Sequence, residues 1–234
     1  MVPWQHADDS GQEVAGPGGR AARRRWGAKC LAERCLAAFV LAGISPLFAL
    51  LALLVWATSG RPVFYRSNRL GRGGKVFCLY KFRSMRVNAP AVLGADGKLL
   101  TLKNDPRLTP AGRFLRLGFD ELPQLFNVVR GEMCLVGPRP DVPSELERYT
   151  VRQRVRLQVL PGITGLAAVV GGRDMNNAQN YELDVRYVES SSLCTDLLIL
   201  AVTLPYSLGM RRLGRRVFSR YLAGIEQFGD GVSA

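Results

Sequence analysis

Hydrophobic and polar positions divide the sequence into a polar N-terminal segment, a long apolar run and a mixed remainder. Residues 1–25 combine glycine, alanine, arginine and a few acids without periodicity, which predicts a disordered basic tail. Residues 35–60 carry no charge. As a straight helix this run would reach roughly 39 Å, more than the ~30 Å hydrocarbon core of a bilayer and too long for a signal peptide. We therefore assign residues 26–60 to a membrane helix.

Basic residues flank this run on both sides. They are Arg23, Arg24, Arg25, Lys29 and Arg34 before it, and Arg61, Arg66, Arg69, Arg72 and Lys75 after it. A spanning helix normally has unequal flanks, so equal ones favour both ends on the cytoplasmic side. Ser45 and Pro46 lie near the middle: Pro46 should kink the helix, and Ser45 can donate a hydrogen bond to a preceding carbonyl. We expect a re-entrant helix bent at Ser45–Pro46, with a spanning helix as the alternative.

After Gly60 the pattern changes to short strands and helices. Residues 76–85 are rich in β-branched and aromatic residues, and the glycines of residues 69–75 (RLGRGGK) suit a hairpin turn with solvated charges. Residues 109–117 predict a short helix after a Thr109 cap. A second, amphipathic helix that ends at Gly131 is predicted by the spacing of four apolar residues, Leu122, Leu125, Phe126 and Val129.

The C-terminal half predicts further turns and helices. Residues 161–166 (PGITGL) indicate a rigid turn, and residues 181–189 a helix in which Glu182 and Asp184 could pair with arginines. Residues 196–218 are apolar and then basic, which is typical of a helix lying in a membrane interface. The fold class is α/β and rich in helix. We place one folded domain at 61–195, the candidate for any catalytic function, and the interfacial helix and tail at 196–234.

The net charge and the rare residue types limit the ligands and catalytic groups that this chain can use. The chain has 32 Lys and Arg against 19 Asp and Glu, a net charge of +13, which fits nucleic acid, an anionic membrane face or phosphorylated substrates. No nucleic-acid-binding motif accompanies this charge. The single histidine, His6, lies in the predicted tail, so a histidine base is excluded. Five cysteines without a CxxC pair predict reduced thiols in a cytoplasmic compartment, and Cys134 has no histidine to activate it.

Two adjacent carboxylates stand before the amphipathic helix, in the sequence GFDELPQLF (118–126). Acids are favoured at helix N-termini, so Asp120 is expected to be the N-cap of this helix. A reactive pair formed by Asp120 and Glu121 is the alternative. Further on, Gly-Pro-Arg-Pro (137–140) predicts a rigid turn that holds Arg139 outward.

The order of these pieces resembles a known family. An apolar helix with a central Ser-Pro is followed by VFYRSNRLGRGGKVFCLYKFRSM, DELPQLFNVVRGEMCLVGPRP, PGITGL and ELDVRYVE. This order, over roughly residues 29–210, is similar to that of the bacterial sugar transferases, the monotopic phosphoglycosyl transferases. The resemblance implies a monotopic membrane protein whose re-entrant helix is broken at Ser45–Pro46, on the cytoplasmic face of the bacterial plasma membrane.

The resemblance also implies a reaction. A UDP-sugar gives its sugar-1-phosphate to undecaprenyl phosphate and UMP leaves, in two steps, through a phosphosugar on Asp120 and with Mg²⁺ held by Asp120 and Glu121. Such a step starts the assembly of exopolysaccharide, capsule, O-antigen or glycoprotein glycans. An aspartate suits this role because it is ionised at neutral pH without an activating base. The partners are UDP-sugar, undecaprenyl phosphate and the membrane, not nucleic acid.

Further site residues follow from motif membership. The resemblance assigns substrate phosphates to three cations, Lys81, Arg83 and Arg116, and the nucleotide to the turn formed by Pro138, Arg139 and Pro140. The flanking prolines would reduce the entropy lost when Arg139 is presented to a ligand.

The sequence departs from the family pattern in two places. Three residues separate Arg116 from Asp120 where the family usually has four, which leaves Arg113 as an alternative phosphate ligand. After PGITGL, Ala168 and Val170 replace Gln and Asn, and an added glycine precedes Arg173, so Arg173 is a weak candidate for a phosphate ligand. These changes fit an altered sugar, a retuned pocket or reduced activity. A catalytically inactive, membrane-bound scaffold is therefore the alternative function.

Overall fold

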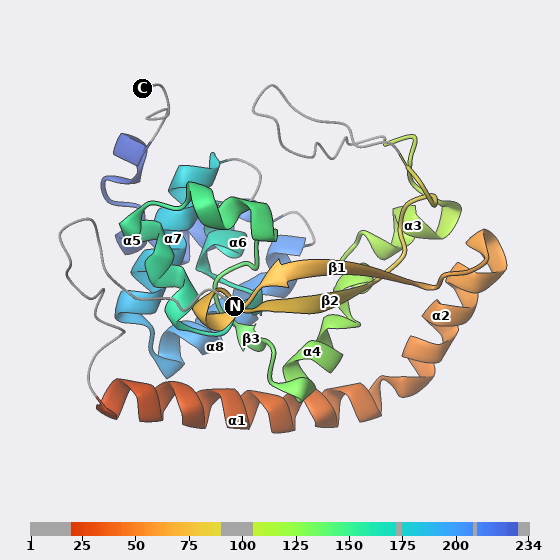
Figure 1. The fold of residues 1–234 in the computed structure, drawn as a ribbon, viewed down its shortest axis with the longest axis horizontal. Coiled ribbons are helices and arrows are strands. Elements are labelled where there is room, and N and C mark those ends of the chain that lie inside the picture. The colour runs from red at the N-terminus through yellow and green to blue at the C-terminus, as the bar shows by residue number, and fades with distance from the viewer. Residues whose placement is uncertain (1–19, 90–104, 172–174, 208–209, 229–234) are drawn as a thin grey trace.

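A long helix forms one border of the molecule. The computed structural model describes residues 20–89, 105–171, 175–207 and 210–228, and it begins with α1 (Arg20–Gly43). The sequence assigned residues up to 25 to a disordered tail, and for 20–25 this prediction is wrong. Alanine and arginine are good helix formers, so the basic cluster continues the helix. Figure 1 shows α1 running beneath the other elements.

The chain bends sharply at Ile44. α1 and α2 (Ser45–Ser59) meet at 67°. Pro46 lies in the first turn of α2, where its missing N–H leaves no hydrogen bond unmade. The expected hydrogen bond is present: Ser45 Oγ donates to the carbonyl of Ala42 at 2.8 Å. Across the described ranges, no helix taken alone is long and apolar enough to cross a membrane, whereas the bent pair reaches that length and composition together.

A two-stranded hairpin crosses the centre of the molecule. β1 (Phe64–Leu70) and β2 (Val76–Phe82) are antiparallel, with Tyr65 opposite Lys81. The predicted turn between them is confirmed, because Gly73 and Gly74 adopt φ values of 67° and 73° that favour glycine. β2 ends three residues before the predicted residue 85. Figure 1 shows the hairpin extending over α4 (Gln124–Arg130).

The two helices predicted in the middle of the chain are present. Thr109 caps α3 (Pro110–Leu115) by accepting a hydrogen bond from the N–H of Gly112 at 2.9 Å, and α4 ends at Gly131 with φ 77°. The start of α4 corrects the prediction, because Pro123 and not Asp120 is its N-cap. Asp120 lies in a separate 3₁₀ turn, Phe119–Glu121, which follows Gly118 at φ 118°. This left-handed glycine turns the chain before α4 begins, and α4 has no side-chain cap hydrogen bond at Pro123.

A second, small sheet joins two segments that are distant in the sequence. β3 (Cys134–Val136) pairs in parallel with β4 (Gly162–Thr164). The sequence predicted a turn over residues 161–166, and this is wrong: β4 leads directly into α6 (Leu166–Val170). Glycine permits the pairing because a Cβ on Gly162 would lie 2.1 Å from the backbone nitrogen of Gly137. A short apolar segment with glycines can be a strand when another backbone must approach it closely.

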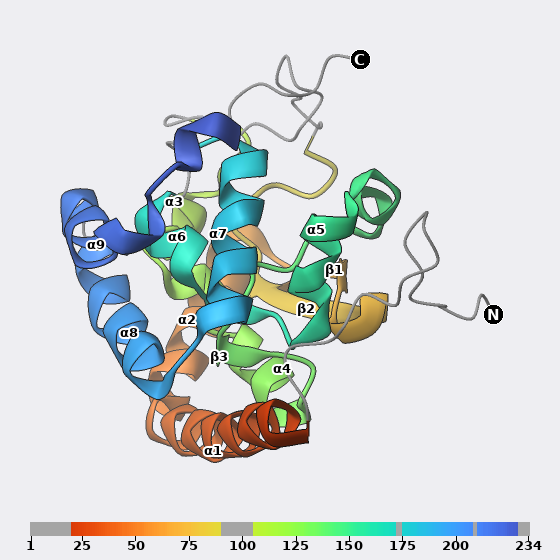
Figure 2. The ribbon, with the colours of Figure 1, turned by 90° about the vertical axis from the view of Figure 1, so that its left-hand side faces the viewer.

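The remaining helices pack around one main core. They are α5 (Val151–Arg154), α7 (Asn177–Ser190), α8 (Leu193–Ser207) and α9 (Arg211–Val217), with 3₁₀ turns after α5 and after α9. α7 confirms the helix predicted at 181–189. The predicted domain boundary at residue 196 falls inside α8, and the predicted segment 196–218 forms two helices (Figure 2). The core draws on distant parts of the chain, including Trp26, Val136, Leu183, Tyr187, Ile199, Phe218 and Ile225.

Three helices keep large apolar side chains exposed. On α1 and α2 they include Leu31, Leu36, Phe39, Leu50, Leu53 and Trp56, and on α8 they include Leu193, Leu197 and Leu204. Phe39 is 79% exposed and Leu193 is 74% exposed. Where exposed apolar side chains form a patch, the patch marks a site of contact with another apolar phase or protein.

Candidate active site

Three segments that are distant in sequence meet at the two adjacent carboxylates. Glu121 Oε1 accepts a hydrogen bond from Lys81 Nζ of β2 at 2.5 Å. Arg139 Nη1, from the turn after β3, lies 4.0 Å from the same oxygen. Asp120 precedes Glu121 in the 3₁₀ turn before α4. The structure therefore brings together Lys81, Asp120, Glu121 and Arg139, which the sequence identified separately.

The two carboxylates have opposite electrostatic environments. Burial raises the pKa of Asp120, as does the charge of Glu121, and the cations Lys81 and Arg116 only partly offset them. Burial alone would also raise the pKa of Glu121. There, the charges of Lys81 and Arg139 and hydrogen bonds from Lys81 and Gln124 outweigh burial and hold the pKa below its usual value. Glu121 is therefore well neutralised by its cations, whereas Asp120 remains short of positive charge.

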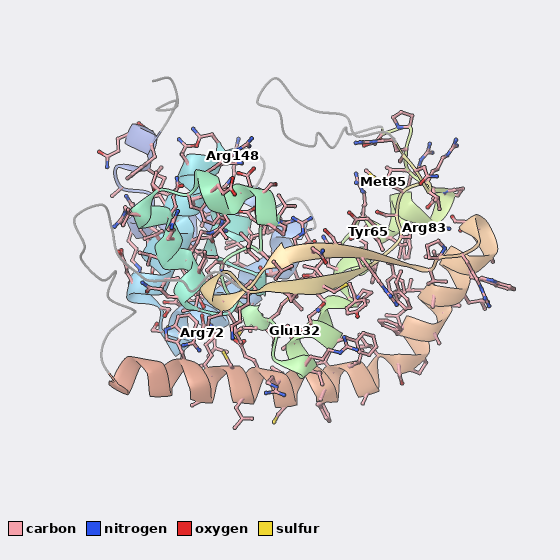
Figure 3. The ribbon with its side chains drawn as sticks, in the orientation of Figure 1. Tyr65, Arg72, Arg83, Met85, Glu132 and Arg148 are labelled. Atoms are coloured by element: carbon pink, nitrogen blue, oxygen red, sulfur yellow. The ribbon has the colours of Figure 1, made fainter. Side chains whose placement is uncertain are left out.

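The proposed phosphate ligands are not equivalent. The charge of half-buried Arg116 acts on Asp120, which favours Arg116 over the exposed Arg113 of α3. Arg83 is only 5% exposed, and it donates hydrogen bonds to the carbonyls of Gly60 and Arg61, both at 3.0 Å, and of Ser59. Figure 3 shows Arg83 beside the end of α2. This geometry indicates that Arg83 anchors the C-terminus of α2 rather than holding a phosphate.

Not every predicted residue can be placed. Arg173, the weak phosphate candidate, lies outside the described residues. Pro138 and Pro140 flank Arg139 as expected, and the Arg139 side chain is 64% exposed. The outward orientation predicted for Arg139 is thus present.

Asn127 is a site-supporting residue that the sequence analysis missed. It is fully buried in α4, where its Oδ1 accepts from the N–H of Tyr80 at 3.2 Å. Its Nδ2 donates to the carbonyl of Cys78 and to Glu132 Oε2, both at 2.7 Å. These bonds fix the free edge of β2, and with it Lys81, to the helix that follows Glu121. An asparagine inside a predicted helix was the available signal, since asparagine has low helix propensity.

Arg156 supports the Arg139 turn from behind. Its side chain is 3% exposed, and Nη2 donates to the carbonyl of Arg139 and to Asp184 Oδ2, both at 2.6 Å. Nη1 donates to Tyr149 Oη at 2.8 Å and to Asp141. The pairing expected for Asp184 is therefore confirmed. Arg156 was missed because no local pattern distinguishes it from its neighbouring arginines.

The pairing expected for Glu182 is also confirmed. Glu182 binds Arg152 at 2.8 Å and Arg186 at 3.0 Å. Glu182 and Asp184 thus stabilise the packing of α7 and lie outside the group around Asp120. Burial raises the pKa of Asp184 to about 6, which still leaves it ionised at neutral pH beside Arg156.

A polar seam connects α1 to the strand that carries the Arg139 turn. Lys29 Nζ donates to the carbonyl of Val136 at 2.8 Å, and Glu33 accepts from the N–H of Leu135 at 2.8 Å. Between these contacts, the sulfur atoms of Cys30 and Cys134 lie 2.7 Å apart. All five cysteines are free, as predicted, and Cys134 is buried in this seam. Helix α1 and the active centre are therefore joined through one short strand.

Comparison with known proteins supports the family resemblance found in the sequence. The sequence profile of the family "Bacterial sugar transferase" matches residues 24–209. The exopolysaccharide production protein ExoY of Sinorhizobium fredii is 40% identical over 182 residues, which cover 73% of this chain and 80% of ExoY. The undecaprenyl-phosphate galactose phosphotransferase of Salmonella typhimurium is 45% identical over 156 residues, 62% of this chain and 33% of that longer protein.

A third relative extends the same picture. The UDP-glucose:undecaprenyl-phosphate glucose-1-phosphate transferase of Xanthomonas campestris is 40% identical over 195 residues, 79% of this chain and 39% of that protein. The chain thus spans most of the length of ExoY but less than half of the length of the two longer transferases. The profile match over most of the chain, with relatives at this level of identity, shows that the protein belongs to the bacterial sugar transferase family and is a phosphoglycosyl transferase.

Proposed function

We propose that this chain transfers a sugar-1-phosphate from a UDP-sugar to undecaprenyl phosphate and releases UMP, as a first step of exopolysaccharide or related glycan assembly. The names of its relatives supply the substrate classes. The observation that carries the proposal is the convergence of Lys81, Arg116 and Arg139 on the Asp120–Glu121 pair. Phosphoryl transfer needs a positioned nucleophile and cations around the phosphates, and this group provides both.

Asp120 is the proposed nucleophile. One of its carboxylate oxygens attacks the phosphorus that carries the sugar, and the bond from this phosphorus to the oxygen of UMP breaks with its electron pair. An oxygen of undecaprenyl phosphate then attacks the same phosphorus, and the Asp120 carboxylate leaves. The lower positive charge around Asp120 favours a reactive carboxylate, whereas Glu121 is held by Lys81 and Arg139. Glu121 would keep these two cations beside the diphosphate.

The site also fits a magnesium ion. The pKa of Asp120 is raised by burial and by Glu121, so the local cations do not neutralise it fully. Within the described ranges no group of three or more potential ligand side chains occurs, so Asp120 and Glu121 would hold the ion together with substrate phosphates and water, as is usual for Mg²⁺. When bound, the ion would neutralise charge on the diphosphate oxygens.

The bent helix pair suits a re-entrant attachment to the cytoplasmic leaflet of the bacterial plasma membrane. Its support is the 67° bend, the exposed apolar side chains of α1, α2 and α8, and the basic flanks. With Cys35 and Cys194 replaced by serine, cysteines introduced at exposed Ala28 and Arg66 should both be shielded from an external thiol reagent in intact cells. Labelling at one of the two positions would establish a crossing helix instead.

A UMP-release assay tests the reaction. Purified protein with Mg²⁺ and undecaprenyl phosphate is given a panel of UDP-sugars, beside the variant Asp120→Asn. We expect UMP from at least one sugar, and a loss of about 10³-fold or more in the variant. Release from no sugar in the panel would favour the inactive scaffold.

The covalent step has its own test. Without undecaprenyl phosphate, intact-protein mass spectrometry should detect a phosphosugar adduct on the wild type. The adduct should be absent from Asp120→Asn. An adduct on the variant, or equal turnover by it, would overturn the role of Asp120.

A further inference from the structure

Arg69 lies on the face of the hairpin that carries Lys81. Tyr65 pairs directly with Lys81 across the two strands, so their side chains share one face. Because side chains alternate along a strand, Arg69 lies on that face too, four residues after Tyr65. Arg66 lies on the opposite face, where its guanidinium stacks over the ring of Tyr80 at 5.7 Å. The hairpin thus separates two arginines of the same strand into different environments.

The environment of Arg69 is unfavourable for a cation. Its Nε atom is buried and has no hydrogen-bond acceptor among the described residues. Burial lowers the pKa of Arg69, and the nearby charge of Arg139 lowers it further. Asp141 attracts Arg69, but that carboxylate is already bound to Arg156 and Tyr149. The guanidinium of Arg69 therefore lies near that of Arg139, which itself reaches Glu121 only at 4.0 Å.

We propose that Arg69 is a substrate-binding residue which, with Arg139, holds a phosphate of the nucleoside diphosphate sugar. The proposal rests on the function proposed above and adds a residue to it. A guanidinium offers several N–H donors in a planar fork that matches phosphate oxygens, and a phosphate between Arg69 and Arg139 would satisfy the buried Nε and remove their repulsion. The sequence suggested that the charges of the RLGRGGK segment are solvated. The buried Nε of Arg69 corrects this prediction.

The position of β1 favours the nucleotide over the lipid phosphate as the ligand. β2 packs on α4, and α4 packs on α1, whereas β1 packs on the 3₁₀ turn Pro143–Arg148 that follows the Arg139 turn. Figure 1 shows β1 on the side of β2 away from α1. Arg69 thus lies on the strand farther from the helix proposed to enter the membrane, and near the turn proposed to bind the nucleotide.

Steady-state kinetics test the assignment. For Arg69→Met we expect the KM for the UDP-sugar to rise by about 10- to 100-fold, since a hydrogen bond between charged groups is lost. The KM for undecaprenyl phosphate should stay unchanged, and Arg69→Lys should recover part of the loss because it keeps the charge but not the fork. Arg66→Met, on the other face of the same strand, is the matched control and should match the wild type. An unchanged KM for the UDP-sugar, or a rise confined to undecaprenyl phosphate, would overturn the proposal.

Thermal unfolding separates a ligand-binding role from a structural one. Without ligand, Arg69→Met should melt at the same temperature as the wild type or higher, because it removes a buried, unsatisfied cation. UDP should raise the Tm of the wild type but shift Arg69→Met much less. A lower Tm without ligand together with an equal UDP shift would identify Arg69 as structural.

The same measurement distinguishes this inference from the proposed reaction. If the wild type releases no UMP but UDP stabilises it more than Arg69→Met, the binding assignment stands and the reaction fails. If the wild type is active and Arg69→Met has normal KM and a normal UDP shift, only the assignment of Arg69 fails. Should Arg69→Met not fold, Arg69→Lys is measured in both assays, and wild-type values for it would overturn the proposal.

Discussion

The active centre and the cluster around Arg156 are both rich in charged side chains, but they differ in how far those charges are paired. At Arg156, a side chain that is 3% exposed donates to two carboxylates, a tyrosine and a carbonyl. At the active centre, Glu121 is paired with cations, but Asp120 is short of positive charge and Arg69 has a buried donor without a partner. The two regions touch, because Arg156 holds the backbone of Arg139.

This difference separates structural charges from those available to a ligand. A buried ion network is tolerated when its charges are balanced, as around Arg156, where Nη1 and Nη2 bind carboxylates although Nε has no partner among the described residues. Unbalanced charges reduce stability and persist at sites where a substrate or metal completes them. The paired cluster thus fixes the backbone on which the unbalanced group depends. Variants in the cluster should therefore affect stability first, and variants in the active centre should affect activity first.

The largest effect on stability is expected for Arg156→Met. The variant leaves the buried Asp184 and the half-buried Asp141 without their shared cation, which should cost about 3–5 kcal/mol of unfolding free energy. Urea denaturation measures this loss. Adding Asp184→Asn should restore part of it, because one unpaired charge is removed. A loss below about 1 kcal/mol would mean that the cluster is not structural.

Lys81→Met should mainly affect activity. Removing this cation leaves Glu121 less neutralised, and we expect kcat/KM to fall by about 100-fold with little change in Tm. Because Lys81 lowers the pKa of Asp120, its loss should raise that pKa. The acidic limb of the kcat/KM profile, where Asp120 becomes ionised, should then move to higher pH.

Glu121→Gln supplies the opposite control. The charge of Glu121 raises the pKa of Asp120, so the acidic limb should move to lower pH in this variant, even where activity is reduced. If the acidic limb moved in the same direction in Lys81→Met and Glu121→Gln, ionisation of Asp120 would not set the pH profile of kcat/KM.

Asn127→Ala tests whether a buried polar residue that only supports the active centre affects both stability and activity. It leaves the N–H of Tyr80 and the carbonyl of Cys78 without their side-chain partner, which should cost about 1–3 kcal/mol. Since β2 then holds Lys81 less firmly, kcat should also fall while the KM for the UDP-sugar changes less. Unaltered kcat at reduced stability would restrict Asn127 to a structural role.

The smallest effect is expected for Arg148→Ala. Arg148 pairs with Glu145 at 3.1 Å, but its side chain is 71% exposed (Figure 3). Exposed ion pairs contribute about 0–1 kcal/mol, so the Tm and kcat should stay close to those of the wild type. A loss comparable with that of Arg156→Met would contradict the distinction between exposed and buried pairs.

Elements with strong local signals were predicted well. The Thr109 cap, the glycines of the hairpin turn, the Gly131 helix end and the Ser45 hydrogen bond are each encoded within a few residues. Errors arose where distant backbone decides the outcome. Gly162 became part of a strand because Gly137 lies against it, and Asp120 lost its expected capping role because Gly118 starts a separate turn.

By itself the sequence determined the family, the bend-forming Ser-Pro and the adjacent acids with their candidate cations, because these depend on residue type and short-range order. Only the tertiary structure decided which arginines serve which purpose. Arg83 anchors a helix end, Arg116 acts on Asp120, and Arg69 lies near the charge of Arg139. The physical reason is that the role of a charge depends on its burial and on its neighbours in space. The fold, and not the local sequence, brings those neighbours together.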